Sequence, residues 1–132
     1  MRIFIIISSL IIFFILAFVG SAEIVFENAQ SQKNVKLFKM AEGLNPFVSE
    51  YFYEDYELTK DINALRQAMR LEPTKPAYHM YYGLALIDQK PRTRVGDQQA
   101  VIEICKAARL KPYSKQYQEI CNKFKAVISI PT

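Results

Sequence analysis

Two cysteines are the residues of this chain with the most readily stated chemistry. Cys105 lies seven residues before Pro112, and Cys121 lies nine residues after it. If two antiparallel helices meet near Tyr113, the two thiols lie at about the same height and could face each other. In an oxidising compartment they would form a disulfide that closes a loop of about 16 residues and contributes ~3 kcal/mol. The alternative is two buried free thiols on neighbouring helices whose side chains point apart.

The single histidine offers little further chemistry. His79 stands among Tyr78, Tyr81 and Tyr82, and no cysteine or carboxylate lies around it at metal-ligand spacing. We therefore expect His79 to pack in a core or groove, and we expect no metal and no cofactor. The chain also lacks the G-x-S-x-G, P-loop and H-E-x-x-H motifs and any paired catalytic set. These absences predict that the protein is not an enzyme.

Tyrosines and arginines are the side chains best suited to bind another protein. Tyrosine combines a large apolar ring with a hydroxyl and is enriched at interfaces, and arginine can meet a carboxylate-rich partner or acidic lipid. We expect about half of the aromatic side chains to be buried by packing alone, and a solvated loop is the alternative for the arginines. Nucleic acid is not expected as a partner. The candidate partner-binding residues are Tyr51, Tyr78, Tyr82, Tyr117, Arg92 and Arg94.

Three similar phrases indicate the elements that must position these side chains. They are "MAEGLNP" at 40–46, "QAMRLEP" at 67–73 and "KAARLKP" at 106–112, and a tyrosine stands five residues after each proline. The shared unit is A-x-x-L-x-P-x-x-x-x-Y. Alanine and leucine three residues apart share one helix face, and proline cannot continue a helix. Each phrase therefore predicts a helix end followed by the start of another helix.

Apolar residues recur at helical spacing before each phrase, and further helical stretches follow at 48–58, 76–89 and 114–127. The one strand-like segment, "AVISI" at 126–130, is interpreted as a frayed end. The sequence therefore predicts an all-α fold.

The alternating helices, with "YHMYYGLAL" opening one pair, resemble the tetratricopeptide repeat (TPR) family over residues 34–127. Gly83 matches the glycine at which the two helices of a pair cross, and Ala100 and Ala107 match the two small positions of the second helix. The proline spacings of 27 and 39 depart from the family's ~34, so we expect extra residues in a loop at 89–97. The family's frequent tryptophan position is occupied by Phe52, His79 and Gln118.

The resemblance implies stacked helix pairs whose concave surface binds a partner, as in scaffolds and adaptors that are rarely enzymes. The alternative is a small bundle folded on itself beside a larger membrane protein.

The N-terminal segment is apolar from Ile3 to Val19, about 17 residues, which is the lower limit for a membrane-spanning helix at ~1.5 Å rise per residue. Arg2 precedes it and acidic residues follow, so we expect a cytoplasmic N-terminus and an extracytoplasmic remainder. The small residues of Gly20–Ala22 offer a cleavage site, so the segment is either a retained anchor, which we favour, or a signal peptide. The predicted division is 1–22 as the membrane segment and 23–132 as one exported TPR-like domain.

Charge is unevenly distributed along the chain. Residues 42–61 hold six acids and one lysine, whereas residues 90–132 hold nine bases and three acids. The sequence favours a non-catalytic assembly subunit, anchored by residues 3–19 and accessory to a larger envelope complex. The alternatives are a structural subunit of an extracellular filament, with copies of itself as partners, and a cleaved soluble adaptor.

Overall fold

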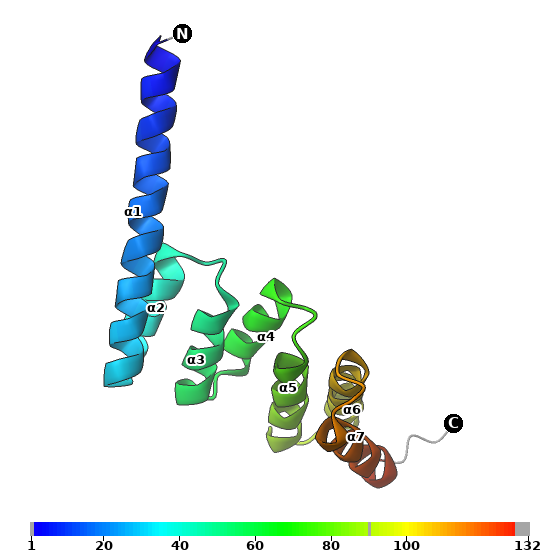
Figure 1. Ribbon diagram of the computed structural model, residues 1–132. Coiled ribbons are helices and arrows are strands. Elements are labelled where there is room, and N and C mark those ends of the chain that lie inside the picture. The colour runs from blue at the N-terminus through cyan, green and yellow to red at the C-terminus, as the bar shows by residue number, and fades with distance from the viewer. Residues whose placement is uncertain (1, 90, 129–132) are drawn as a thin grey trace. The chain divides into compact units, whose positions relative to one another are not determined.

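The computed structural model describes residues 2–89 and 91–128, with side chains from Ile6 onward. These residues form seven helices and no strands, which confirms the predicted all-α fold with one apolar N-terminal helix (Figure 1). The chain divides into two compact units, residues 1–60 and 61–132. The helices are α1 (Arg2–Gln32), α2 (Val35–Leu44), α3 (Ser49–Thr59), α4 (Ile62–Leu71), α5 (Pro76–Asp88), α6 (Arg94–Leu110) and α7 (Lys115–Val127). Of the expected frayed end at 126–130, residues 129–130 lie outside the described residues.

Helix α1 is one uninterrupted helix with two different surroundings along its length. The side chains from Ile6 to Val19 are exposed, whereas Ala22 and Ala29 are fully buried against α2. Phe26 lies between them and meets Phe38 of α2, with ring centroids 5.5 Å apart. In Figure 1, α2 runs beside the C-terminal half of α1 only. The sequence placed the end of the membrane segment at residue 22, and the structure continues the same helix to Gln32.

Helix α3 completes the first unit. The ring of Tyr51 lies 4.5 Å from that of Phe26, centroid to centroid, and joins the core formed by α1 and α2. Lys39 of α2 reaches the buried Asp55 of α3, with Nζ 2.7 Å from Oδ2. Burial acts to lower the pKa of Lys39, but the hydrogen bonds and charges of Asp55 and Glu42 outweigh it and raise that pKa above 10.5.

The three repeated phrases end three helices in the same way. Helices α2, α4 and α6 end at the leucine of each phrase. The next residue donates its backbone N–H to the carbonyl oxygen of the repeated alanine, four residues earlier. These N···O distances are 2.9, 3.0 and 3.1 Å. All three alanines are fully buried, so a larger side chain would hold the helices apart. The residues concerned are Ala41, Ala68 and Ala107.

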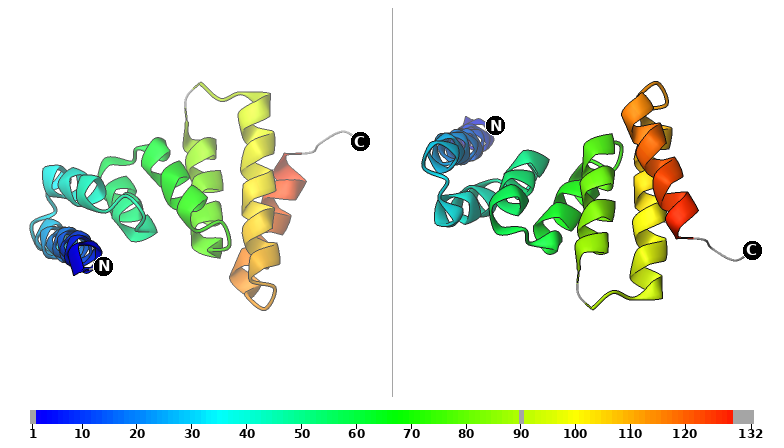
Figure 2. Two further views of the ribbon diagram at one scale, coloured as in Figure 1. Left: turned by 90° about the horizontal axis from the view of Figure 1, so that it is seen from above. Right: turned by 90° about the horizontal axis from the view of Figure 1, so that it is seen from below.

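The second unit contains α4 to α7. Figure 2 shows α5 and α6 side by side, with α7 on the other side of α6. Gly83 of α5 lies against α6, and a Cβ built on it would be 2.6 Å from Ile104 Cγ1 and 2.7 Å from the Ala100 carbonyl oxygen. Only glycine therefore permits this approach, as the resemblance implied.

The loop before α6 is shorter than the sequence predicted: the prediction was a loop over 89–97, but α6 begins at Arg94. Thr93 caps α6, because its hydroxyl accepts a hydrogen bond from Gly96 N at 3.0 Å. Residues 94–97 are therefore the first turn of a helix, and the prediction of a loop there is wrong. A threonine N-cap followed by a carboxylate in the first turn, at Asp97, is the signal that could have identified this helix start.

Candidate functional site

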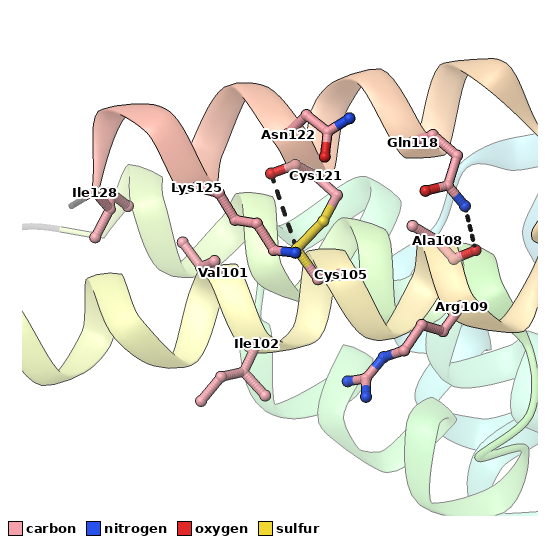
Figure 3. A pocket seen from close by; sticks show the side chains of 10 residues that line it. All are labelled: Val101, Ile102, Cys105, Ala108, Arg109, Gln118, Cys121, Asn122, Lys125 and Ile128. Carbon is pink, nitrogen blue, oxygen red and sulfur yellow. Dashed lines mark hydrogen bonds between the residues drawn. A yellow bond between two sulfur atoms is a disulfide. The ribbon is translucent and has the colours of Figure 1, made fainter. Parts of the chain in front are cut away.

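A groove of about 590 Å³ lies between α6 and α7, on the surface of the second unit (Figure 3). Its position follows from helical spacing, because its residues recur every three or four positions along each helix and so share one face. From α6 it is lined by Val101, Ile102, Cys105, Ala108 and Arg109, and from the α7 side by Gln118, Cys121, Asn122, Lys125 and Ile128.

A disulfide fixes the spacing of the two helices. Cys105 and Cys121 are joined through their sulfur atoms, with 4.9 Å between their Cα atoms, and Figure 3 shows the bond crossing from α6 to α7. Small residues on α6, Cys105 and Ala108, allow α7 to lie close. One turn earlier on α7, the Gln118 amide donates to the Ala108 carbonyl oxygen at 2.9 Å. The disulfide and this hydrogen bond together fix the distance between α6 and α7, and with it the width of the groove.

The groove combines an apolar surface with positive charge. Ile102 is half exposed at 50%, and Val101 and Ala108 contribute apolar atoms beside it. Arg109 and Lys125 line the same groove, and neither has an ion-pair partner within 2–89 and 91–128. An extended segment with apolar side chains and carboxylates fits this chemistry. The sequence analysis counted both cations but assigned neither to a site.

The predicted tyrosines are mostly inside the two units. Tyr51, Tyr78 and Tyr82 are only 5%, 1% and 8% exposed. The ring of Tyr78 lies 4.8 Å from Lys75 Nζ, and the hydroxyl of Tyr82 accepts from Arg66 at 3.3 Å. These three side chains therefore pack within their own units, and none of them lines the groove between α6 and α7.

The other three predicted residues also lie outside the groove. Tyr117 is half-buried, packs on the core of the second unit and has Lys111 Nζ 5.7 Å from its ring centroid. Arg92 is exposed and paired, with Nη2 3.0 Å from Asp97 Oδ1. Arg94 is exposed at the start of α6. The structure does not bring the six predicted residues together.

His79 is buried, and both of its ring nitrogens have partners. Nδ1 lies 2.7 Å from Glu103 Oε2, and Nε2 lies 2.8 Å from the Pro73 carbonyl oxygen. His79 thus links α6 to the turn between α4 and α5, and it has a packing role. Glu103 could not be identified from the sequence as a partner of His79, because the two residues are 24 positions apart in the chain. Among the described residues, no cluster of three or more His, Cys, Asp or Glu side chains could hold a metal ion.

Comparison with known proteins identifies the type of fold but no family. No family model matches the chain, and no curated protein matches it. Among solved structures, the chain is similar to the type III secretion chaperone SycD of Yersinia enterocolitica, crystallised in complex with a peptide of the translocator YopD. The TM-score is 0.55 at 11% sequence identity, and the match covers 85% of this chain and 87% of that one. SycD is a TPR-like all-helical protein, and the likeness confirms a TPR-like helical repeat fold.

Proposed function

We propose that this chain is a non-catalytic protein-interaction subunit, held at a membrane by α1 and accessory to a larger envelope complex. One observation carries the proposal: a single helix is apolar and exposed from Ile6 to Val19, and one face of it packs in the first unit further along, with Ala22 and Ala29 buried and Phe26 half-buried. By length and composition, α1 could cross a membrane. Exposed apolar surface of this extent is costly in water and favourable in a bilayer.

The charges at the two ends of the apolar segment give its orientation. Arg2 precedes it, and Glu23 and Glu27 follow it. Because positive charge favours the cytoplasmic side, the N-terminus lies in the cytoplasm and both units lie outside it. The disulfide between α6 and α7 agrees with this orientation, because disulfides persist in oxidising compartments.

Burial of Ala22 favours a retained anchor over a cleaved signal peptide. Ala22 is fully buried in the core of the first unit, beside Ala41 and Tyr51. Cleavage after Ala22 would cut α1 within its helical run and separate that residue from the fold. The alternative is a cleaved, soluble adaptor, and measuring the mass of the N-terminus distinguishes it from the retained anchor.

The groove between α6 and α7 is the surface through which the subunit binds a partner protein. SycD, which shares the fold, was crystallised with a peptide of another protein. In this chain the cations Arg109 and Lys125 beside Ile102 favour a segment that carries both carboxylates and apolar side chains. Charge complementarity of this kind gives specificity and speeds association.

The test is purification of the full chain from membranes in mild detergent, followed by mass measurement and identification of bound proteins. We expect an intact Met1 and a larger membrane protein in fixed stoichiometry. A chain that starts at Glu23 would instead favour the soluble adaptor, and long polymers recovered without detergent would favour the filament subunit.

A charge-reversed pair tests the groove itself. Arg109→Glu with Lys125→Glu should strongly reduce the recovered partner, because both cations line the groove. Lys115→Glu with Lys123→Glu is the matched control, since it makes the same charge change at exposed positions of α7 outside the groove. Equal recovery with both double variants would contradict binding in this groove.

A further inference from the structure

The turn between α2 and α3 exposes a phenylalanine beside the apolar part of α1. Phe47 is 81% exposed, at the edge of a second groove of about 500 Å³. Asn45 is the only polar residue of this groove, and its side-chain oxygen accepts a hydrogen bond from Phe47 N at 3.4 Å. The remaining lining residues are Ile11, Phe14, Ile15, Phe18, Val19, Leu44 and Pro46.

The position of this groove relative to the proposed bilayer follows from the α1 residues that line it. That wall consists of five side chains between Ile11 and Val19, which belong to the segment that the proposed function places in the bilayer. Whatever fills the groove must therefore contact membrane-embedded residues on one side and Phe47 on the other. Water fits poorly, because the groove offers it almost no polar atoms.

The turns that follow the other two repeated phrases have different chemistry. The residue before each proline, the proline itself and the two residues after it are "NPFV" at 45–48, "EPTK" at 72–75 and "KPYS" at 111–114. The first turn is uncharged and carries phenylalanine and valine, whereas each of the others carries charge and hydroxyls. Tyr113 occupies the position equivalent to Phe47 and is 98% exposed. Only the turn beside α1 is therefore suited to a hydrocarbon environment.

We infer that the α2–α3 turn is embedded in the outer leaflet of the membrane, with Phe47 among lipid acyl chains that also fill the groove against α1. This inference rests on the proposed membrane anchor. It adds a second point of membrane contact, on the same compact unit, which fixes the first unit against the bilayer surface. Apolar side chains next to a spanning helix gain their full burial only when lipid covers them.

The test uses tryptophan as a single reporter, because the chain contains none. Three full-length variants, Phe47→Trp, Tyr113→Trp and Phe14→Trp, are reconstituted in phosphatidylcholine vesicles with or without bromine atoms on the acyl chains. We expect brominated lipid to remove most of the emission of the Phe47→Trp and Phe14→Trp variants and little of that of the Tyr113→Trp variant.

Each other outcome overturns the inference in a distinguishable way. Quenching of the Phe14→Trp variant without quenching of the Phe47→Trp variant would retain the anchor and reject the embedded turn. A blue-shifted but unquenched Phe47→Trp variant would show that protein, such as a second copy of the chain, covers the turn. Absence of quenching in both variants would reject the anchor together with the inference, and equal quenching at positions 47 and 113 would reject a specific contact.

Discussion

Gly83 is the residue on which the contact between α5 and α6 depends most directly. A Cβ there would lie within 2.7 Å of both a side-chain carbon of Ile104 and the backbone oxygen of Ala100. Because the backbone cannot move away without separating the helices, Gly83→Ala should lower the free energy of unfolding by about 1–3 kcal/mol. Chemical denaturation followed by far-UV circular dichroism measures this change.

Gly43 provides the matched control for this substitution. It lies in α2, and a Cβ built on it would meet nothing within 4 Å. Gly43→Ala should therefore raise the free energy of unfolding by roughly 0.5–1 kcal/mol, since alanine is the better helix former. Equal effects of the two substitutions would contradict the close approach at Gly83.

Tyr51 gives the first unit a dependence on alkaline pH. Burial raises the pKa of Tyr51 above its ordinary value of 10.0, and the charges of Glu23 and Glu50 add to this. The folded state therefore holds the phenolic proton more tightly than the unfolded state does. This contribution to stability is complete below about pH 10 and is lost as the pH rises through the folded pKa.

Tyr51→Phe removes that titration, so the variant should lose less stability than the parent chain between pH 9 and about pH 11. Thermal melts at a series of pH values measure the difference. Tyr113→Phe is the control, because Tyr113 is almost fully exposed. Identical alkaline losses for the parent and both variants would argue against the burial of Tyr51.

The tyrosines also show where sequence reasoning stops. The spacing of Tyr51, Tyr78 and Tyr117 after each proline was readable from the sequence, and all three stand near the start of a helix. Which face of each helix a neighbour covers depends on how the helices cross, and spacing alone does not give this. Because Tyr51 and Tyr78 are buried, replacing either of them with alanine would affect stability more than binding.

Helix α7 relies on the disulfide more than on its own packing. Cys121 is its one fully packed residue among those described, and its other core contacts come from half-buried side chains. Closing a loop with a separation of 16 residues restricts the unfolded chain. Cys105→Ala with Cys121→Ala should therefore cost ~3 kcal/mol. Thermal unfolding with and without reductant measures this cost.

The same double variant should bind the partner more weakly, because the groove needs α7 at a fixed distance from α6. Reduction of the parent chain should reproduce the loss of stability and leave the double variant unchanged. A parent chain whose melting is insensitive to reductant would contradict a stabilising role of the bond.

The C-terminal half of α1 is an element that the sequence analysis missed. Ala22, Val25, Phe26 and Ala29 follow helical spacing and pack on α2, but the intervening polar residues concealed the pattern. A search for this spacing beyond residue 22 could have found it. The packed part of α1 begins at Ala22, just after the exposed apolar segment ends at Val19, so the two parts of the helix have separate roles in the anchored arrangement that we propose.

Two truncations separate these roles. A chain that lacks residues 2–19 should remain helical and no longer require detergent, because it retains Ala22 and Ala29, which are buried, and Phe26, which packs on α2. A chain that lacks residues 2–29 should lose the cooperative unfolding of the first unit. Size-exclusion chromatography and thermal melts distinguish the two, and precipitation of the shorter truncation without detergent would contradict this division of α1.

For the molecule as a whole, the sequence predicted the helical class, the ends of α2, α4 and α6 and the TPR-like repeat, because alanine, leucine and proline act locally. It did not predict the groove between α6 and α7. That groove exists because the last helix leaves one face of α6 partly uncovered, which depends on how the elements pack. Arg109 and Lys125 become neighbours only through that packing.

The orientation of the whole chain is open to direct measurement. We expect alkaline phosphatase fused to the C-terminus to be active, since that enzyme requires the oxidising side of the membrane. β-Galactosidase fused at the same position should be inactive. The opposite pattern of activities would reverse the predicted topology.

The continuity of α1 has one mechanical consequence. No turn or glycine-rich linker separates the apolar segment from the residues that pack on α2, so α1 is one continuous helix without a hinge. In the membrane-anchored arrangement that we propose, a tilt or rotation of the apolar segment would therefore also move the part of α1 that packs in the first unit. A partner that binds the proposed membrane segment and rotates it would then rotate the first unit as well, so the proposed anchor would transmit motion in addition to fixing position.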